Sequence, residues 1–352
     1  MSQSRRRILE LLEEGHITAE EADMMLNELG QDFNNTSEQA SEDDSQTDKR
    51  ESKFTQRFKR DFKQMAEGVS QFVGDTVQRF NPKDVKRLFH FDDHNVKQIA
   101  VDWQNGPITV KPSDDHVIKV QVEGKVFNQS DGNEAETLFD QSTVVTIEGD
   151  QLVLRQKRKD MFVNATIYVP DHTYDDIDIQ TVSGSVKLMD LTSHTSSLQT
   201  VNGSVKVLGH EADSAQVETR HGSIKCDDVA FDYVKLETTV GSVHFDGEAD
   251  EIDTNVVTGT AKILQDRDDA SRMDINVTTG AIMLHVPDDM RVNGKAYTSL
   301  NSVDVDMDDV TIQELGDQKV KRQMQFFHGE SDEPRCDIRL AAKTGNIKVK
   351  QS

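Results

Sequence analysis

The sequence predicts a mainly β protein, a β-solenoid or two-sheet β-roll made of coils of about 20 residues. Three observations predict it: a recurring turn marker, alternating apolar residues after each marker, and a nearly constant spacing between markers. The marker-to-marker steps are 19, 19, 19, 18, 21 and 21 residues. A fixed period of this size indicates one unit that is repeated and stacked. The seven consecutive markers are Gly184, Gly203, Gly222, Gly241, Gly259, Gly280 and Asn301.

Each coil begins with a turn, because glycine and asparagine accept a left-handed backbone at little cost. Apolar residues then alternate with period two, which indicates a strand with one buried face. No polar residue interrupts either of the two resulting columns. The first column is Ile108, Val186, Val205, Ile224, Val243, Ala261, Ile282, Val303 and Ile347. The second is Val110, Leu188, Val207, Cys226, Phe245, Ile263, Leu284, Val305 and Val349.

A second short strand is expected before each marker, so that one coil holds two strands. Threonine stands three residues before the turn in five coils: Thr181, Thr200, Thr219, Thr238 and Thr298. Two further markers, Gly106 and Gly345, lie outside the array. Residues 92–180 are expected to add irregular strands that form the first coils or a β cap. The whole repeat domain is therefore expected to span residues 95–352.

The N-terminal third is predicted to be organised differently. Residues 4–30 form a helical hairpin module, in which Gly15 ends the first helix and a capping box from Thr18 to Glu21 opens the second. Residues 31–52 are polar and carry seven acidic residues against two basic ones, which indicates a flexible linker. The hairpin is too small to be stable alone, so a partner or a second copy is expected.

Residues 53–91 are predicted to form a basic amphipathic helix, with nine basic residues against four acidic ones. Pro82 ends its regular part, and the apolar pattern continues to Phe91. A phenylalanine stripe beside a basic face is typical of a helix on an anionic membrane. The alternative is a stripe that caps the solenoid end or forms a helix–helix interface. The residues expected to make these contacts are Phe54, Phe58, Phe62, Met65, Phe72, Phe80, Arg57, Lys59, Arg60 and Lys63.

Composition excludes several classes of function. The net charge of −24 and pI near 4.8 argue against nucleic acid as a partner, although Arg5 to Arg7 are basic. Cys226 falls in a core column, while Cys336 is expected to be free. No apolar run approaches the roughly 20 residues that a membrane-spanning helix needs, and the start lacks the apolar segment of a signal peptide. The expected location is the cytoplasm or the periphery of the cell membrane or surface.

Catalytic constellations are not expected. The eleven histidines are scattered, with no His-Glu-x-x-His or Cys-x-x-Cys spacing, so neither a metal nor a cofactor is predicted. The acidic run from Asp304 to Asp309 lacks the glycine and glutamate of a calcium loop. A carbohydrate-active enzyme would need a carboxylate cluster on one strand face, where this chain favours lysine. We therefore expect a protein that is not an enzyme.

An outward position between the two core columns carries mostly lysine. In stacked coils these side chains would form a row with a spacing of about 4.8 Å. One interpretation is an anion-binding stripe for phosphate-rich polymers or lipid headgroups. The other is a set of solvated lysines paired with nearby acids, which also protect sheet surfaces from aggregation. The positions are Lys187, Lys206, Lys225, His244, Lys262 and Lys348.

The Thr-x-x-Gly-Ser-Val coils resemble the putative-adhesin β-strand-repeat family of Gram-positive bacteria. The opening stretch from Arg6 to Ala22 is similar to the short helical module found before that repeat. The combination resembles the daptomycin-sensing surface protein group. That resemblance implies a non-enzymatic sensor or regulator of cell-envelope stress, with membrane-active peptides and membrane-bound signalling proteins as partners. The alternative is a structural or adhesive β-solenoid whose helix only caps or oligomerises.

Overall fold

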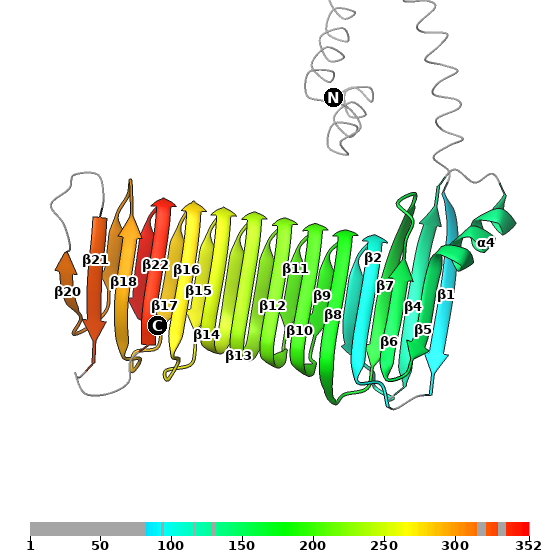
Figure 1. Cartoon of the computed structure of the whole chain (residues 1–352), viewed down its shortest axis with the longest axis horizontal. Helices are drawn as coiled ribbons and strands as arrows, with labels where there is room; N and C mark the ends of the chain where they lie inside the picture. The colour runs from blue at the N-terminus through cyan, green and yellow to red at the C-terminus, as the bar shows by residue number, and fades with distance from the viewer. Residues whose placement is uncertain are drawn as a thin grey trace, which may run out of the picture. The chain divides into compact units, whose positions relative to one another are not determined.

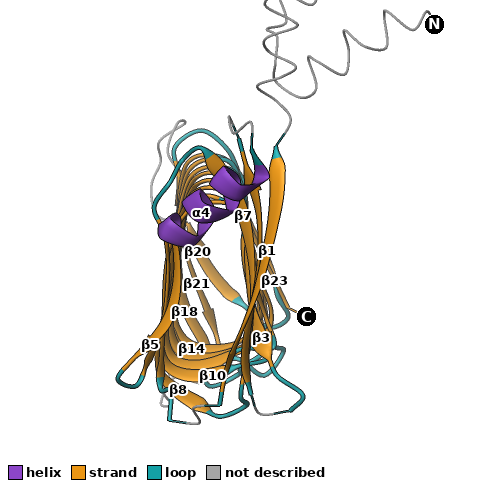
Figure 2. Cartoon of the chain, turned by 90° about the vertical axis from the view of Figure 1, so that its right-hand side faces the viewer, coloured by secondary structure: helices purple, strands orange, loops and turns teal. Residues whose placement is uncertain are grey.

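The computed structural model describes residues 82–92, 95–115, 117–127, 131–314, 322–329 and 336–351. These residues form a stack of β coils with two facing sheets, as Figures 1 and 2 show. The predicted hairpin module of residues 4–30, the linker of residues 31–52 and the helix residues 53–81 lie outside the described residues. No helix within the described ranges is long and apolar enough to cross a membrane.

The first sheet contains the strands that precede the glycine markers. Its hydrogen-bonded order places strands from both ends of the sequence among the regular coils. The order is β5 (Thr143–Glu148), β6 (Gln151–Gln156), β2 (Gln98–Asn105), β8 (Thr173–Ser183), β10 (Thr192–Asn202), β12 (Glu211–His221), the C-terminal parts of β13 (Ile224–Val240) and β14 (Val243–Thr258), β16 (Arg272–Thr279), β22 (Cys336–Thr344), β18 (Val292–Thr298), β21 (Arg322–His328) and β20 (Thr311–Glu314).

The second sheet contains the strands that follow the markers. Strands β13 and β14 pass through the corner between the sheets and belong to both. The order is β1 (Lys83–Phe91), β4 (Ile118–Val126), β7 (Met161–Val169), β3 (Ile108–Pro112), β9 (Val186–Met189), β11 (Val205–Leu208), the N-terminal parts of β13 and β14, β15 (Ala261–Gln265), β17 (Ile282–Val286), β23 (Ile347–Gln351) and β19 (Val303–Asp306).

The predicted repeat is confirmed, and both apolar columns face the core. Every member of the two columns is buried except Val303 and Val305 in the last coil, which are half-buried. Each coil is too thin to bury these side chains alone, so burial depends on the neighbouring coils. Central pairs are parallel. Three of the four end pairs, β1 with β4, β5 with β6 and β20 with β21, are antiparallel, whereas β19 with β23 is parallel.

Gly106 and Gly345 lie outside the consecutive array of markers in the sequence, but in the structure their coils stack directly on coils of that array. The coil of β22 and β23 sits between β16–β17 and β18–β19. At the other end, the coil of β2 and β3 sits between β6–β7 and β8–β9. Gly106 therefore precedes Gly184 in the stack, and Gly345 follows Gly280. Each terminal coil is thus held between two others.

Glycine is required at the corner mainly because neighbouring backbones approach closely. A Cβ atom on Gly222 would lie 1.9 Å from the carbonyl oxygen of Gly203. The predicted reason, a left-handed backbone, applies at some coils, such as Gly241 with φ of 149°, but Gly222 has no positive φ. The threonines before the turn support the same corner, since Thr219 Oγ1 donates to the Gly203 carbonyl at 2.8 Å.

The predicted helix over residues 53–91 is wrong in its last part. Lys83–Phe91 forms the antiparallel edge strand β1, which pairs with β4. Val85 is buried and Phe89 and Phe91 pack against the core, so the apolar residues after Pro82 follow a period of two. This period suits a strand with one buried face.

One described helix was not predicted. α4 (Gly132–Ser142) begins after Asp131, whose side chain accepts a hydrogen bond from the Asn133 backbone. Its buried residues Ala135 and Phe139 join the core, and Figure 2 shows it across the end of the stack between the two sheets. Arg87 of β1 holds it from outside through Asp140 and Glu136, each at 3.0 Å. The helix therefore caps this end of the coil stack.

Candidate functional site

The strand register brings the predicted lysine positions together on the outer face of the second sheet. Lys206 lies beside Lys187 on one side and Lys225 on the other. His244 follows Lys225 and is itself followed by Lys262. Five consecutive strands thus carry these residues, which we call the lysine row. Lys348 is separated from the row by Met283.

The lysine row is only partly neutralised. Lys225 donates to Asp227 at 2.7 Å, within its own strand. By contrast, Lys187, Lys206 and Lys262 make no ion pair with the residues that the structure describes. Lys187 and Lys206 are direct cross-strand neighbours, so their charges repel, whereas the row neighbour of Lys262 is His244. The arrangement offers a line of cations to an anionic ligand that presents several charges.

The acidic run from Asp304 to Asp309, which the sequence offers as a possible cation site, forms ion pairs with lysines instead. Asp304 and Asp306 lie on the last strand of the second sheet, β19. Lys348 Nζ lies 3.6 Å from Asp304, and Lys350 Nζ lies 3.8 Å from Asp306. These carboxylates therefore pair with the neighbouring strand β23.

A second outward row runs beside the lysine row, two residues further along each strand. Its members are apolar in three coils and acidic in two adjacent ones: Met189, Leu208, Asp227, Asp246 and Leu264. Asp227 and Asp246 are direct cross-strand neighbours, and His244 precedes Asp246 on the same face. One ligand atom from each of these three residues lies within 4.8 Å of the others. The sequence alone does not reveal this group, because its members are 2 to 19 residues apart and lie on two different strands.

His244 lies half-buried beside the two aspartates. Partial burial lowers the pKa of its imidazole, and the positive charge of Lys262 lowers it further. Its Nε2 atom lies 4.0 Å from Oδ1 of Asp227. A neutral imidazole beside two carboxylates presents one nitrogen and several oxygens as acceptors or ligands.

The corner opposite the glycines forms an acidic groove of about 670 Å³. Asp266 at its edge has its pKa raised by burial and by the nearby charges of Asp246 and Glu248. Its acidic lining residues are Asp190, Glu211, Asp227, Asp228, Asp246, Glu248 and Asp266. The groove adjoins the lysine row, so opposite charges lie side by side on one edge of the stack.

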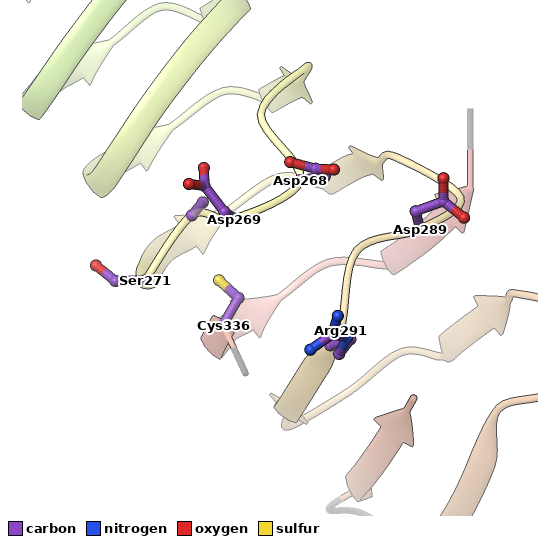
Figure 3. Close-up of a pocket in the computed structure, with 7 residues that line it drawn as sticks. Asp268, Asp269, Ser271, Asp289, Arg291 and Cys336 are labelled. Atoms are coloured by element: carbon purple, nitrogen blue, oxygen red, sulfur yellow. The ribbon is translucent and has the colours of Figure 1, made fainter. Parts of the chain in front are cut away.

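A second pocket, of about 330 Å³, lies where the loops before β16 and β18 meet the start of β22. Figure 3 shows Asp268, Asp289, Arg291 and Cys336 around it. Cys336 is buried, and burial raises the pKa of its thiol to about 12. The predicted core cysteine, Cys226, is also buried, with its pKa raised to about 12 by burial. Neither thiol is therefore poised as a nucleophile.

A buried polar network lies inside the coils. His210 is fully buried, and its Nδ1 donates to the Leu191 carbonyl at 2.5 Å. Its Nε2 then accepts from Ser196 Oγ at 2.9 Å, a tautomer assigned from these partners. Burial lowers the pKa of His210 to about 4. The serine and histidine contact each other, but both are enclosed in the core, where no substrate has access.

The comparisons with known proteins identify the family. The Toastrack DUF4097 family model matches residues 96–350. The protein YvlB of Bacillus subtilis (strain 168), itself uncharacterized, is 31% identical over 363 aligned residues, which cover all of both chains. These matches identify the family but not the daptomycin-sensing group within it, so that resemblance stays a prediction.

Some solved structures are similar to this chain at low identity. A putative adhesin from Bacteroides fragilis is 14% identical with a TM-score of 0.42, over 77% of this chain and 97% of that one. A putative lipid binding protein from Parabacteroides distasonis is 10% identical with a TM-score of 0.39, over 76% and 97%. The family match over residues 96–350 decides the assignment, and this chain belongs to the Toastrack DUF4097 family.

Proposed function

We propose that this protein is a non-enzymatic scaffold of the cell envelope whose lysine row binds phosphate-rich anionic surfaces. The single observation that carries the proposal is the register of the row on five consecutive strands. We further propose that this binding serves the response to membrane-active peptides and antibiotics, through contacts with membrane-bound signalling proteins.

The geometry of the lysine row supports a multivalent anion as its ligand. Strand spacing of about 4.8 Å sets a fixed separation between charges. The coils that carry them are rigid because their apolar columns are buried. Lysine is a point charge on a flexible stem, so the row would tolerate variation in the positions of the phosphates. Each cation near an anionic membrane adds about 1 kcal/mol of binding free energy.

The test is co-sedimentation of the full chain with vesicles of phosphatidylglycerol, with phosphatidylcholine vesicles as the neutral comparison. The triple variant Lys187→Glu, Lys206→Glu and Lys262→Glu should bind the anionic vesicles at least about 100-fold more weakly. The matched control changes three exposed lysines elsewhere, Lys157, Lys295 and Lys343, to glutamate. It alters the net charge equally and should retain most of the binding.

A second variant separates the row from the predicted N-terminal helix. Phe58→Glu with Phe62→Glu removes two residues of the phenylalanine stripe and leaves the lysine row intact. Loss of binding in this variant alone would assign the membrane contact to the helix and contradict the role of the row. Absence of binding by the wild-type chain to anionic vesicles and to a polyphosphate polymer would contradict the proposal as a whole.

A further inference from the structure

The repeats of this protein provide an internal reference for what a coil requires. At the outward position of the lysine row, five coils carry four lysines and one histidine, His244. At the next outward position, only the coils of Asp227 and Asp246 are acidic, while the flanking coils carry Leu208 and Leu264. Since the flanking coils stack in the same way without them, coil formation does not require these three residues.

The three residues that depart from the repeat, Asp227, His244 and Asp246, lie close together. His244 and Asp246 are two residues apart on β14, so both side chains point to the same outer face. Asp227 is the direct neighbour of Asp246 on β13. The ligand atoms of all three lie within 4.8 Å of one another. Two aspartates placed side by side repel each other, and the lysine that pairs with Asp227, Lys225, makes no ion pair with Asp246 among the described residues.

We propose that Asp227, His244 and Asp246 form a binding site for a divalent transition ion of the zinc class. An imidazole nitrogen with carboxylate oxygens is a ligand set that Zn²⁺ accepts, with bonds of about 2.0–2.2 Å. The three half-buried side chains would have to rotate to bring their ligand atoms, now within 4.8 Å of one another, to that distance from a common ion. Ca²⁺ and Mg²⁺ prefer sets made of oxygen alone. Three protein ligands leave a coordination position open to water or to an anion.

The neighbouring lysine determines which oxygens are available. Lys225 Nζ donates to Oδ2 of Asp227, whereas Nε2 of His244 faces Oδ1 of the same carboxylate. One oxygen of Asp227 is therefore held by the lysine, and the other is directed toward the histidine. The lysine charge opposes a cation, so the site is expected to bind more tightly when Lys225 is absent. This inference does not depend on the proposed function of the lysine row.

The experiment is isothermal titration of the metal-free full chain with ZnCl₂, and with MgCl₂ for comparison. The wild type should take up zinc in saturable steps that include one equivalent absent from His244→Gln. Asp227→Asn and Asp246→Asn should each weaken that equivalent at least tenfold. His194→Gln is the matched control, because His194 also contacts a carboxylate of a neighbouring coil, Asp213 at 2.7 Å, and belongs to no such trio. It should bind as the wild type does.

A second pair of variants tests the geometry. Lys225→Met should raise the zinc affinity more than Lys206→Met, which removes the same charge from the adjacent coil. Thermal melting by circular dichroism checks that each variant is folded. The inference is overturned if folded His244→Gln retains every zinc equivalent of the wild type, or if magnesium binds as tightly as zinc. An equal gain in both lysine variants would contradict the role of Asp227 as a ligand.

Discussion

The two corners of the coil differ in how much variation they accept. At the glycine corner, the strand register aligns the residues three positions before the markers. Four of them are threonines that donate to the carbonyl of a neighbouring marker: Thr200, Thr219, Thr238 and Thr298. At the opposite corner, the connections range from the continuous strand β14 to the loop between β15 and β16. The connection at the glycine corner is the same from coil to coil, whereas the connection at the opposite corner changes in length.

All the irregularity in the repeat spacing arises at the opposite corner. The single step of 18 residues coincides with a register shift at Asp227 and Val229, between β13 and β14. The first step of 21 coincides with the loop between Gln265 and Arg272. The glycine corner cannot change length, because close backbone contacts and threonine hydrogen bonds fix its path.

The difference between the two corners shows which one can vary in sequence and carry functional residues. The opposite corner carries the acidic groove, the Asp227–His244–Asp246 group and buried His210. The threonines of the glycine corner serve to maintain stacking. Substitutions at the two corners should therefore differ in kind, and the following experiments measure that difference, beginning with the largest effect.

The glycine corner should not accept a single methyl group. Gly222→Ala places a Cβ atom 1.9 Å from the Gly203 carbonyl oxygen, which is backbone and cannot move aside. We expect a loss of about 3 kcal/mol or more in the free energy of unfolding. Urea denaturation measures it. Gly132→Ala is the control, since no atom lies within 4 Å of its Cβ position, and equal stability of the two variants would disprove the close-contact explanation.

Through buried His210, the opposite corner should make the free energy of unfolding depend on pH. The pKa of His210 is lowered from 6.5 to about 4, so the unfolded chain binds a proton more readily than the folded one. The stabilisation is complete above pH 6.5 and is lost as the pH falls toward 4, to a total of about 3 kcal/mol. Urea denaturation at pH 7 and pH 4.5 should show a smaller pH effect in His210→Gln. Exposed His194→Gln should leave the effect unchanged.

Threonines near the glycine corner allow the smallest effect to be measured. Thr219→Val removes the hydrogen bond to the Gly203 carbonyl and should cost about 1 kcal/mol of stability. Thr254→Val is the matched control, because its Oγ1 is buried and has no hydrogen-bond partner. That variant should be neutral or more stable. Equal losses in the two variants would show that the hydrogen bond contributes nothing.

The coil could be predicted because its signal is repeated. The glycine markers and the two apolar columns recur at one period, and each column member lies where alternation places it. Strand β1 could also have been found, since Val85, Phe89 and Phe91 follow a period of two. Helix α4 has a weaker signal in the sequence, because only Ala135 and Phe139 are buried and Leu138 is partly buried against the core.

The order of the coils and the site at Asp227 could not be predicted, for a common reason. Every coil presents the same backbone edges and columns, so the sequence allows any coil to stack on any other. Only the register shows that Gly345 follows Gly280, or that Asp227 lies beside Asp246. In the sequence, His244 is one more member of the lysine row. Its position near Asp227 and Asp246 becomes visible only in the strand register.

The intercalated C-terminal coil affects the order of events during synthesis. Strands β18 and β19 leave the ribosome before β22 and β23, yet the later strands separate them from β16 and β17. Their parallel neighbours exist only once residue 351 has been made. The coils up to β17 can stack as they emerge, but the coil of β18 and β19 must wait until β22 and β23 have left the ribosome. A nascent chain stalled before residue 336 would expose the edges of β16 and β17 to other chains, which favours aggregation.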